Sequence, residues 1–148
     1  MNRRGFTLLE LIMVIVVLST LISMAMPQYE SFVERARTAE AMSAIETIKT
    51  AEQACYLSSG NFKLTNDANL DADLGVHLDR AYWTYDVNNT MLAAPPGYVL
   101  HIGITKYACI KATRTTGPFA GKYIYLIIYD ETIPATYWTG NHPERPRN

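Results

Sequence analysis

The sequence has few of the residues that build catalytic or metal sites. Among 148 residues there are only two cysteines, Cys55 and Cys109, and they form no C-x-x-C pair. This spacing excludes the usual zinc and redox motifs. The three histidines, His77, His101 and His142, show no metal-ligand spacing. No glycine-rich phosphate loop and no G-x-S-x-G motif is present. We therefore expect no enzyme, no cofactor and no bound metal.

The chain also lacks a bias in charge. Thirteen Lys and Arg residues against fourteen Asp and Glu residues give a formal net charge of −1. Without a basic excess there is no electrostatic footprint for nucleic acid, and without an acidic block nothing indicates a disordered acidic tail. The length fits one domain, or one domain with an appendage. Nucleic acid is therefore not an expected partner.

What the sequence does contain is one long apolar run near its N-terminus. From Phe6 to Met26, the only charged residue is Glu10. As a helix this run would extend about 30 Å, the thickness of the hydrocarbon core of a bilayer. A carboxylate inside such a helix costs roughly 2.5–3.5 kcal/mol and usually has a partner. We predict a transmembrane helix over residues 6–27, in which Glu10 is the one charged residue and needs a partner.

The residues before the run predict its orientation. Arg3 and Arg4 form a basic flank, and such a flank stays on the cytoplasmic side. Residues 1–5 are therefore a cytoplasmic leader, and the chain after Pro27 lies outside the cytoplasm. The alternative is an ordinary secretory signal peptide cut after Ser23-Met24-Ala25, but its apolar core would be shorter than this one.

The start of the run carries a specific pattern, Gly5-Phe6-Thr7-Leu8-Leu9-Glu10. It resembles the processing signature of type IV pilins and the related pseudopilins. The resemblance implies a prepilin peptidase that cuts after Gly5 and methylates the new terminus at Phe6. It also implies assembly roles for Glu10 and for Pro27, which stands where family members often have a helix-bending proline.

A helical pattern continues beyond Pro27. One face gathers small and apolar residues: Val33, Ala41, Ala44, Ile45, Ile48, Ala51 and Cys55. Glu46 and Lys49 lie on the other face, spaced to pair across one turn. Gly60 is a natural left-handed cap. These signals predict one helix over residues 6–57, bent but not ended at Pro27, in which residues 28–58 form an amphipathic half.

The remaining residues, 59–148, predict a globular head rich in β-structure. Alternating apolar residues predict four strands, over residues 82–87, 98–104, 107–113 and 122–129. A short helical piece is expected near residues 70–75, and an irregular tail around Trp138 and Gly140. The fold class is α+β: a long N-terminal helix whose half at 28–58 packs, as one domain with the head, on a three- or four-stranded antiparallel sheet. The pilin resemblance implies the same fold.

Two features of the head leave alternatives. Asp67, Asp71 and Asp73 suggest a calcium site, as some pseudopilins have, but the EF-hand spacing is absent and solvated turn residues are favoured. Cys55 lies on the helix face expected to meet the sheet, and Cys109 lies in a strand. We predict a disulfide between them, since an exported domain can retain one; two free, buried cysteines are the alternative.

The resemblance implies a structural subunit of a type IV pilus. Such a subunit waits as a single-pass protein of the inner membrane, its head outside the cytoplasm, and an inner-membrane assembly platform then adds it to a helical homopolymer on the cell surface. Its partners are identical or related pilin subunits. The alternatives are a pseudopilin of type II secretion, a minor pilin, or an adhesin or DNA-uptake subunit. Residues 60–64 lack the proline of the calcium loop in major pseudopilins, which favours a pilin.

Overall fold

The computed structural model describes residues 6–89, 107–129 and 137–143. These residues belong to two compact units, one comprising residues 1–36 and the other residues 37–148. The predicted division of the chain at residues 27 and 58 stays a prediction.

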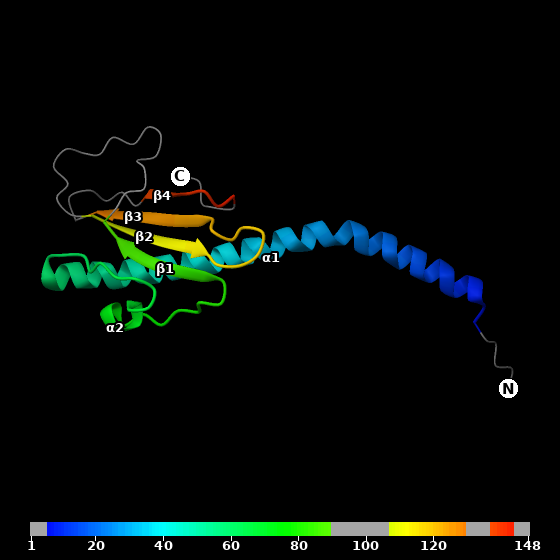
Figure 1. Cartoon of the computed structure of the whole chain (residues 1–148), viewed down its shortest axis with the longest axis horizontal. Coiled ribbons are helices and arrows are strands. Elements are labelled where there is room, and N and C mark those ends of the chain that lie inside the picture. The colour runs from blue at the N-terminus through cyan, green and yellow to red at the C-terminus, as the bar shows by residue number, and fades with distance from the viewer. Residues whose placement is uncertain (1–5, 90–106, 130–136, 144–148) are drawn as a thin grey trace. The chain divides into compact units, whose positions relative to one another are not determined.

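One helix, α1 (Leu8–Ser59), runs through both units and contains Pro27 in its interior. The prediction that the helix passes Pro27 without ending is confirmed (Figure 1). The helix ends where the sequence predicts, because Gly60 adopts a positive φ of 72° and donates its N–H to the carbonyl of Tyr56 at 2.7 Å. The predicted pair of Glu46 and Lys49 is also present, with 3.0 Å between Lys49 Nζ and Glu46 Oε2.

The second unit contains a four-stranded antiparallel sheet in the order β1-β2-β3-β4 (Figure 1). Its strands are β1 (Trp83–Asn88), β2 (Tyr107–Arg114), β3 (Tyr123–Tyr129) and β4 (Tyr137–Gly140). Three predicted strands are thus confirmed, and the one predicted over residues 98–104 lies outside the described residues. The predicted α+β, pilin-like fold is confirmed.

The prediction of an irregular tail around Trp138 and Gly140 is wrong. Residues 137–140 pair with β3, so that Trp138 stands opposite Leu126. Gly140 has a φ of 142°, and a Cβ at this position would overlap the carbonyl oxygen of Tyr123. Only glycine lets the two backbones approach this closely. The tail therefore forms an edge strand that its short, aromatic sequence did not reveal.

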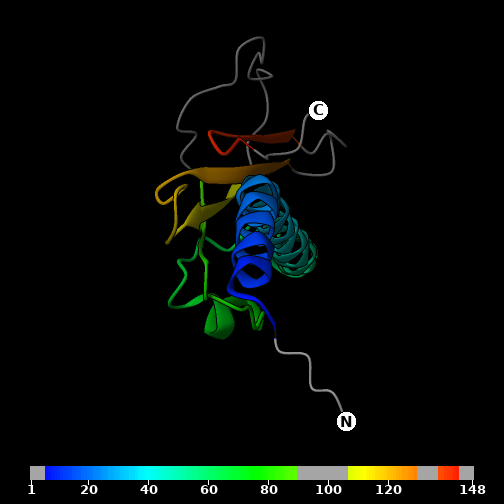
Figure 2. The same cartoon turned by 90° about the vertical axis from the view of Figure 1, so that its right-hand side faces the viewer.

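The core lies between one face of the sheet and the part of α1 from Arg37 onward (Figures 1 and 2). The helix contributes Ala41, Ala44, Ile45 and Ile48, as its small and apolar face predicted. The sheet contributes Trp83, Tyr85, Val87, Ala108, Ile110, Ala112, Ile124, Leu126 and Ile128. The Trp83 indole N–H also donates to the carbonyl of Arg37 at 3.0 Å. Alanines on both elements let backbone approach backbone, which strengthens dispersion contacts.

A short helix, α2 (Leu70–Leu74), lies in the segment between α1 and β1 and confirms the expected helical piece. Gly75 ends α2 in the left-handed conformation, at φ 65°, with its N–H bonded to the carbonyl of Asp71. Leu70 is fully buried in the core. The segment is tied to the sheet by a bridge between Thr65 and Val87.

Candidate functional site

The first turn of α1 contains a reciprocal hydrogen-bond pattern between Thr7 and Glu10. The Glu10 carboxylate oxygen Oε2 accepts bonds from the backbone N–H and from the hydroxyl of Thr7, both at 2.9 Å. In return the backbone N–H of Glu10 donates to the Thr7 hydroxyl at 3.2 Å. This is a capping box, in which a Thr and a Glu three residues apart satisfy each other's free donors at a helix start. We did not predict this capping box from the sequence, although the T-x-x-E spacing from Thr7 to Glu10 is its sequence signature.

The capping box gives Glu10 a partner within its own chain. Charge-assisted bonds from an N–H and a hydroxyl offset part of the cost of a carboxylate in an apolar run. They also orient the carboxylate toward the helix start, where Phe6 lies. Phe6 is 87% exposed, and Gly5, the predicted residue before the cut, lies outside the described residues.

The apolar run of α1 is uncovered within the described structure. Its large side chains are at least 48% exposed from Phe6 to Met26, and none of the best 18-residue window is buried. That window has a mean hydropathy of 2.5, so α1 is long and apolar enough to cross a membrane. The hydroxyls of Ser19 and Thr20 donate to the carbonyls of Val16 and Val17 at 2.9 and 2.8 Å, and so are satisfied within the helix.

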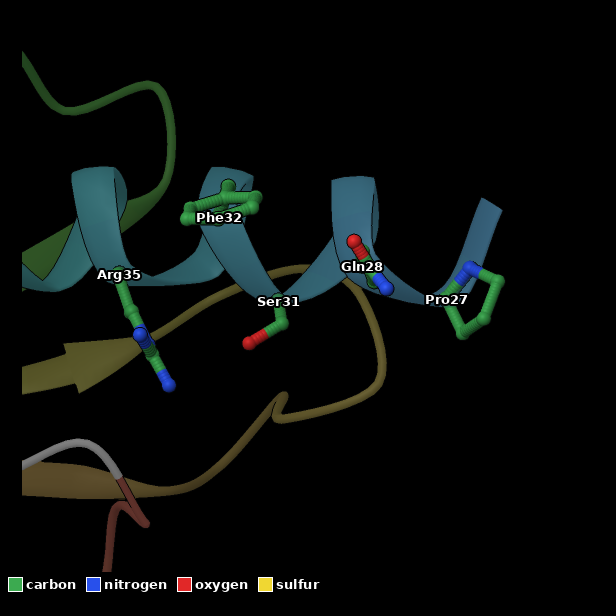
Figure 3. A pocket seen from close by; sticks show the side chains of 5 residues that line it. All are labelled: Pro27, Gln28, Ser31, Phe32 and Arg35. Carbon is green, nitrogen blue, oxygen red and sulfur yellow. The ribbon is translucent and has the colours of Figure 1, made fainter. Parts of the chain in front are cut away.

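At the end of the run α1 carries a shallow groove with a volume of about 340 Å³. Five residues line it: Pro27, Gln28, Ser31, Phe32 and Arg35. Figure 3 shows Ser31 and Arg35 along one edge of the helix and the ring of Pro27 at the end of the groove. The groove therefore combines two apolar side chains with an amide, a hydroxyl and a guanidinium.

The predicted disulfide between Cys55 and Cys109 does not form in this structure, where both thiols are free. Cys109 belongs to a second cluster, with Tyr125 and Ile127. Its strand neighbours Ala108 and Ile110 belong instead to the core against α1. Because successive strand residues point to opposite faces, Cys109 faces away from the helix that carries Cys55.

The aspartates considered for calcium are engaged by basic side chains instead. Arg80 contacts Asp67 at 3.2 Å and Asp71 at 2.9 Å. Asp73 accepts the hydroxyl of Thr65 at 2.6 Å and lies 3.4 Å from Lys63 Nζ. Among the described residues, no group of three or more histidines, cysteines or acidic residues could hold a metal ion.

The aspartate contacts hold the segment around α2 together. Asp71 also meets His77 Nδ1 at 3.3 Å. Hydrogen bonding to Arg80 lowers the pKa of Asp71, and hydrogen bonding to Thr65 lowers that of Asp73. His142 is buried, with its ring centroid 5.4 Å from that of Trp83, while His101 lies outside the described residues. The three aspartates thus hold the segment around α2 through hydrogen bonds and ion pairs, and His142 packs inside the head.

Comparison with known proteins identifies the N-terminal segment. Residues 1–26 match the family model of the prokaryotic N-terminal methylation motif. The chain is type IV pilin-like in its N-terminal signal and in its fold. This pilin-like chain is 34% identical over 55 residues to the type IV major fimbrial protein FimA of Dichelobacter nodosus, covering 37% of this chain and 35% of FimA.

Further relatives show the same pattern. A fimbrial protein of Pseudomonas aeruginosa is 34% identical over 55 residues, covering 37% of the pilin-like chain and 36% of the relative. The type IV major pilin protein PilE1 of Neisseria gonorrhoeae is 36% identical over 64 residues, covering 43% and 39%. The chain thus matches little more than a third of the length of these curated relatives. No solved structure matches the pilin-like chain significantly.

Proposed function

We propose that this chain is the precursor of a structural subunit of a type IV pilus. The observation that carries the proposal is the methylation motif at the start of an apolar run whose large side chains are exposed from Phe6 to Met26. The fimbrial relatives support it, and their structural character bears out the expectation that the chain is not an enzyme. Its localisation is a single-pass inner-membrane precursor with the head outside the cytoplasm, and then a surface fibre.

In this proposal a prepilin peptidase cuts the peptide bond between Gly5 and Phe6 and methylates the new amino group. The leader with Arg3 and Arg4 stays in the cytoplasm, so the cut lies at the inner face of the membrane. Intact-mass measurement and amino-terminal sequencing of the protein from its source cells test this step. We expect a mature chain that begins at methylated Phe6, and a terminus near Met26 would contradict it.

Assembly then follows from the exposed run. Outside lipid, about twenty apolar residues cannot face water, and packing against equivalent helices of related subunits removes that surface from solvent. Contacts that repeat without closing generate a fibre. The assembly platform of the inner membrane is the partner that adds each subunit.

Glu10 has a specific part in this assembly. Cleavage creates an ammonium at Phe6, and methylation keeps its charge. The capping box leaves the Glu10 carboxylate at the helix start, where it can pair with this cation of its own chain or of the neighbouring subunit. The pair between subunits would fix axial register, because a subunit out of register would leave two buried charges unpaired.

Glu10→Gln tests this role against a matched control, Glu30→Gln, which removes a carboxylate just beyond the apolar run. We expect both variants to be inserted and processed, while only Glu10→Gln strongly loses incorporation into fibres sheared from cells without a wild-type copy. A wild-type yield of fibres from Glu10→Gln would contradict the assembly role. If no surface fibre contains the protein although it is processed, the pseudopilin of type II secretion becomes the better assignment.

A further inference from the structure

The segment that follows α1 covers the outer edge of β1 in two places. β1 is an edge strand of the sheet, and uncovered backbone groups on such an edge can pair with another extended chain. In the strap, which we define as residues 61–65, Thr65 exchanges two backbone hydrogen bonds with Val87, at 3.0 and 2.8 Å. Farther along, the Asp67 carboxylate accepts the backbone N–H of Tyr85 at 2.9 Å. Together these two contacts protect the edge.

The two places are anchored in different ways. Asp67 contacts Arg80 at 3.2 Å, and Leu70 is fully buried in the core. The strap is held instead by Glu52 of α1, whose Oε2 accepts the backbone N–H of Lys63 at 2.8 Å. Glu52 is fully buried, and its Oε1 has no hydrogen-bond partner within the described ranges. A group that can lose its proton thus holds the strap, whereas a guanidinium, which stays charged, holds Asp67.

Ionisation of Glu52 weakens this anchor. An ionised carboxylate is costly in a buried place unless both of its oxygens are hydrogen-bonded, so loss of the proton requires water at Oε1. Lifting the strap at Lys63 is the movement that admits this water. The other contacts of the strap are a stack of Phe62 on Tyr56, with ring centroids 4.7 Å apart, and the bond from the Thr65 hydroxyl to an exposed aspartate. These contacts do not depend on the Glu52 proton.

The charged groups around Glu52 do not compensate for its burial. From the strap, the amide and the charge of Lys63 lower the pKa of Glu52, but burial outweighs them and raises it to about 7. The Lys63 ammonium also lies 3.4 Å from Asp73 of α2, which shares its charge. On α1, Lys49 stands one turn before Glu52 and is paired with Glu46 at 3.0 Å. No charged side chain in the described parts of α2 or the sheet contributes to the shift.

We propose that the proton on Glu52 is a switch that keeps the strap closed over the Val87 end of β1. With the proton bound, the strap lies on α1 and Thr65 pairs with Val87. Without it, the strap lifts and the backbone N–H and carbonyl of Val87 become accessible. Because burial raises the pKa of Glu52, the closed strap is fully favoured below about 4.5 and loses its advantage as the pH rises to about 7.

Amide hydrogen exchange of the full chain in detergent, followed by NMR, tests the switch. We expect the protection factors of the Lys63 and Val87 amides to fall about a hundredfold between pH 4.5 and pH 8, the change that pKa values of about 7 closed and 4.5 open imply. Glu52→Gln should abolish this fall. The matched control, Glu46→Gln, removes a half-exposed carboxylate of the same helix and should keep it.

Urea below the unfolding transition separates a lifting strap from unfolding of the whole head. Strap opening exposes little surface, so low urea should leave the protection of the Val87 amide unchanged while it lowers that of Ile110 in β2. Equal urea dependence of the two amides would overturn the inference, as would wild-type protection that does not change with pH. A pH dependence that Glu52→Gln retains, or that Glu46→Gln also loses, would overturn it too. The two wild-type results decide the matter even if Glu52→Gln does not fold.

Discussion

Glu52 offers the sharpest test of how the head packs on α1. Its side chain has no exposed surface, although it is a carboxylate. One oxygen, Oε2, accepts the backbone N–H of Lys63 at 2.8 Å, and the other, Oε1, has no hydrogen-bond partner among the described residues. Burial raises the pKa of Glu52 from 4.5 to about 7, against the smaller opposing effects of the Lys63 amide and charge. The folded head therefore holds this proton more tightly than the unfolded chain does.

The sign of the pH dependence follows from that difference. The contribution of Glu52 to stability is fully present below its unfolded pKa of 4.5 and is lost as the pH rises to about 7. A shift of this size corresponds to about 3 kcal/mol in the free energy of unfolding. Asp71 and Asp73 act in the opposite sense, because their folded pKa values are lowered. Their contribution is lost only as the pH falls through and below the unfolded value of 3.8.

Glu52→Gln keeps the size of the side chain and an oxygen for the Lys63 N–H, but cannot titrate. We expect the variant to match the wild type near pH 4.5 and to be more stable by up to about 3 kcal/mol at pH 8. Urea unfolding of the full chain in detergent, followed by the fluorescence of buried Trp83, measures this. The control is Glu46→Gln, whose carboxylate is 47% exposed and pairs with Lys49. A wild type whose stability rises between pH 5 and 8, or a variant with the wild-type pH slope, would refute the reasoning.

Three further predictions follow from single contacts. Gly140→Ala should destabilise the head by about 2 kcal/mol or more, because the new Cβ overlaps the backbone of β3. The control, Gly121→Ala, lies at φ 78° with open space around it and should cost only about 1–2 kcal/mol. Equal urea unfolding midpoints for the two variants would contradict this prediction. Native thiol labelling should modify Cys55 much faster than Cys109, which is 3% exposed and whose pKa burial raises to about 11. A mass two hydrogens lower, indicating a disulfide, would contradict the free thiols. Thr7→Val should destabilise the first turn of α1 by about 1 kcal/mol, because it removes the hydroxyl of the capping box. Faster amide hydrogen exchange in that turn would report the loss, whereas Thr7→Ser should keep the wild-type exchange rates.

The features of this chain that the sequence alone determined are local ones. An unbroken apolar run fixes a membrane-length helix whatever surrounds it, and Gly60 ends that helix because the left-handed conformation costs glycine little. The strands at β1, β2 and β3 followed from alternation, since side chains alternate between the faces of any strand. The processing segment was recognisable for the same reason: its residues are contiguous.

The tertiary structure decided what depends on residues far apart in the chain. Alternation puts Cys109 and Ile110 on opposite faces of β2, but it does not say which face becomes the core. Because α1 packs on the face that carries Ile110, Ile110 lies in the core and Cys109 lies in the second cluster. The burial of Glu52 depends in the same way on a segment eleven residues away that closes over it. The strand β4 exists because Gly140 lets it approach β3, a contact that no local pattern near Trp138 encodes. Periodicity assigns side chains to faces, but which face becomes buried is decided by the element that packs against it.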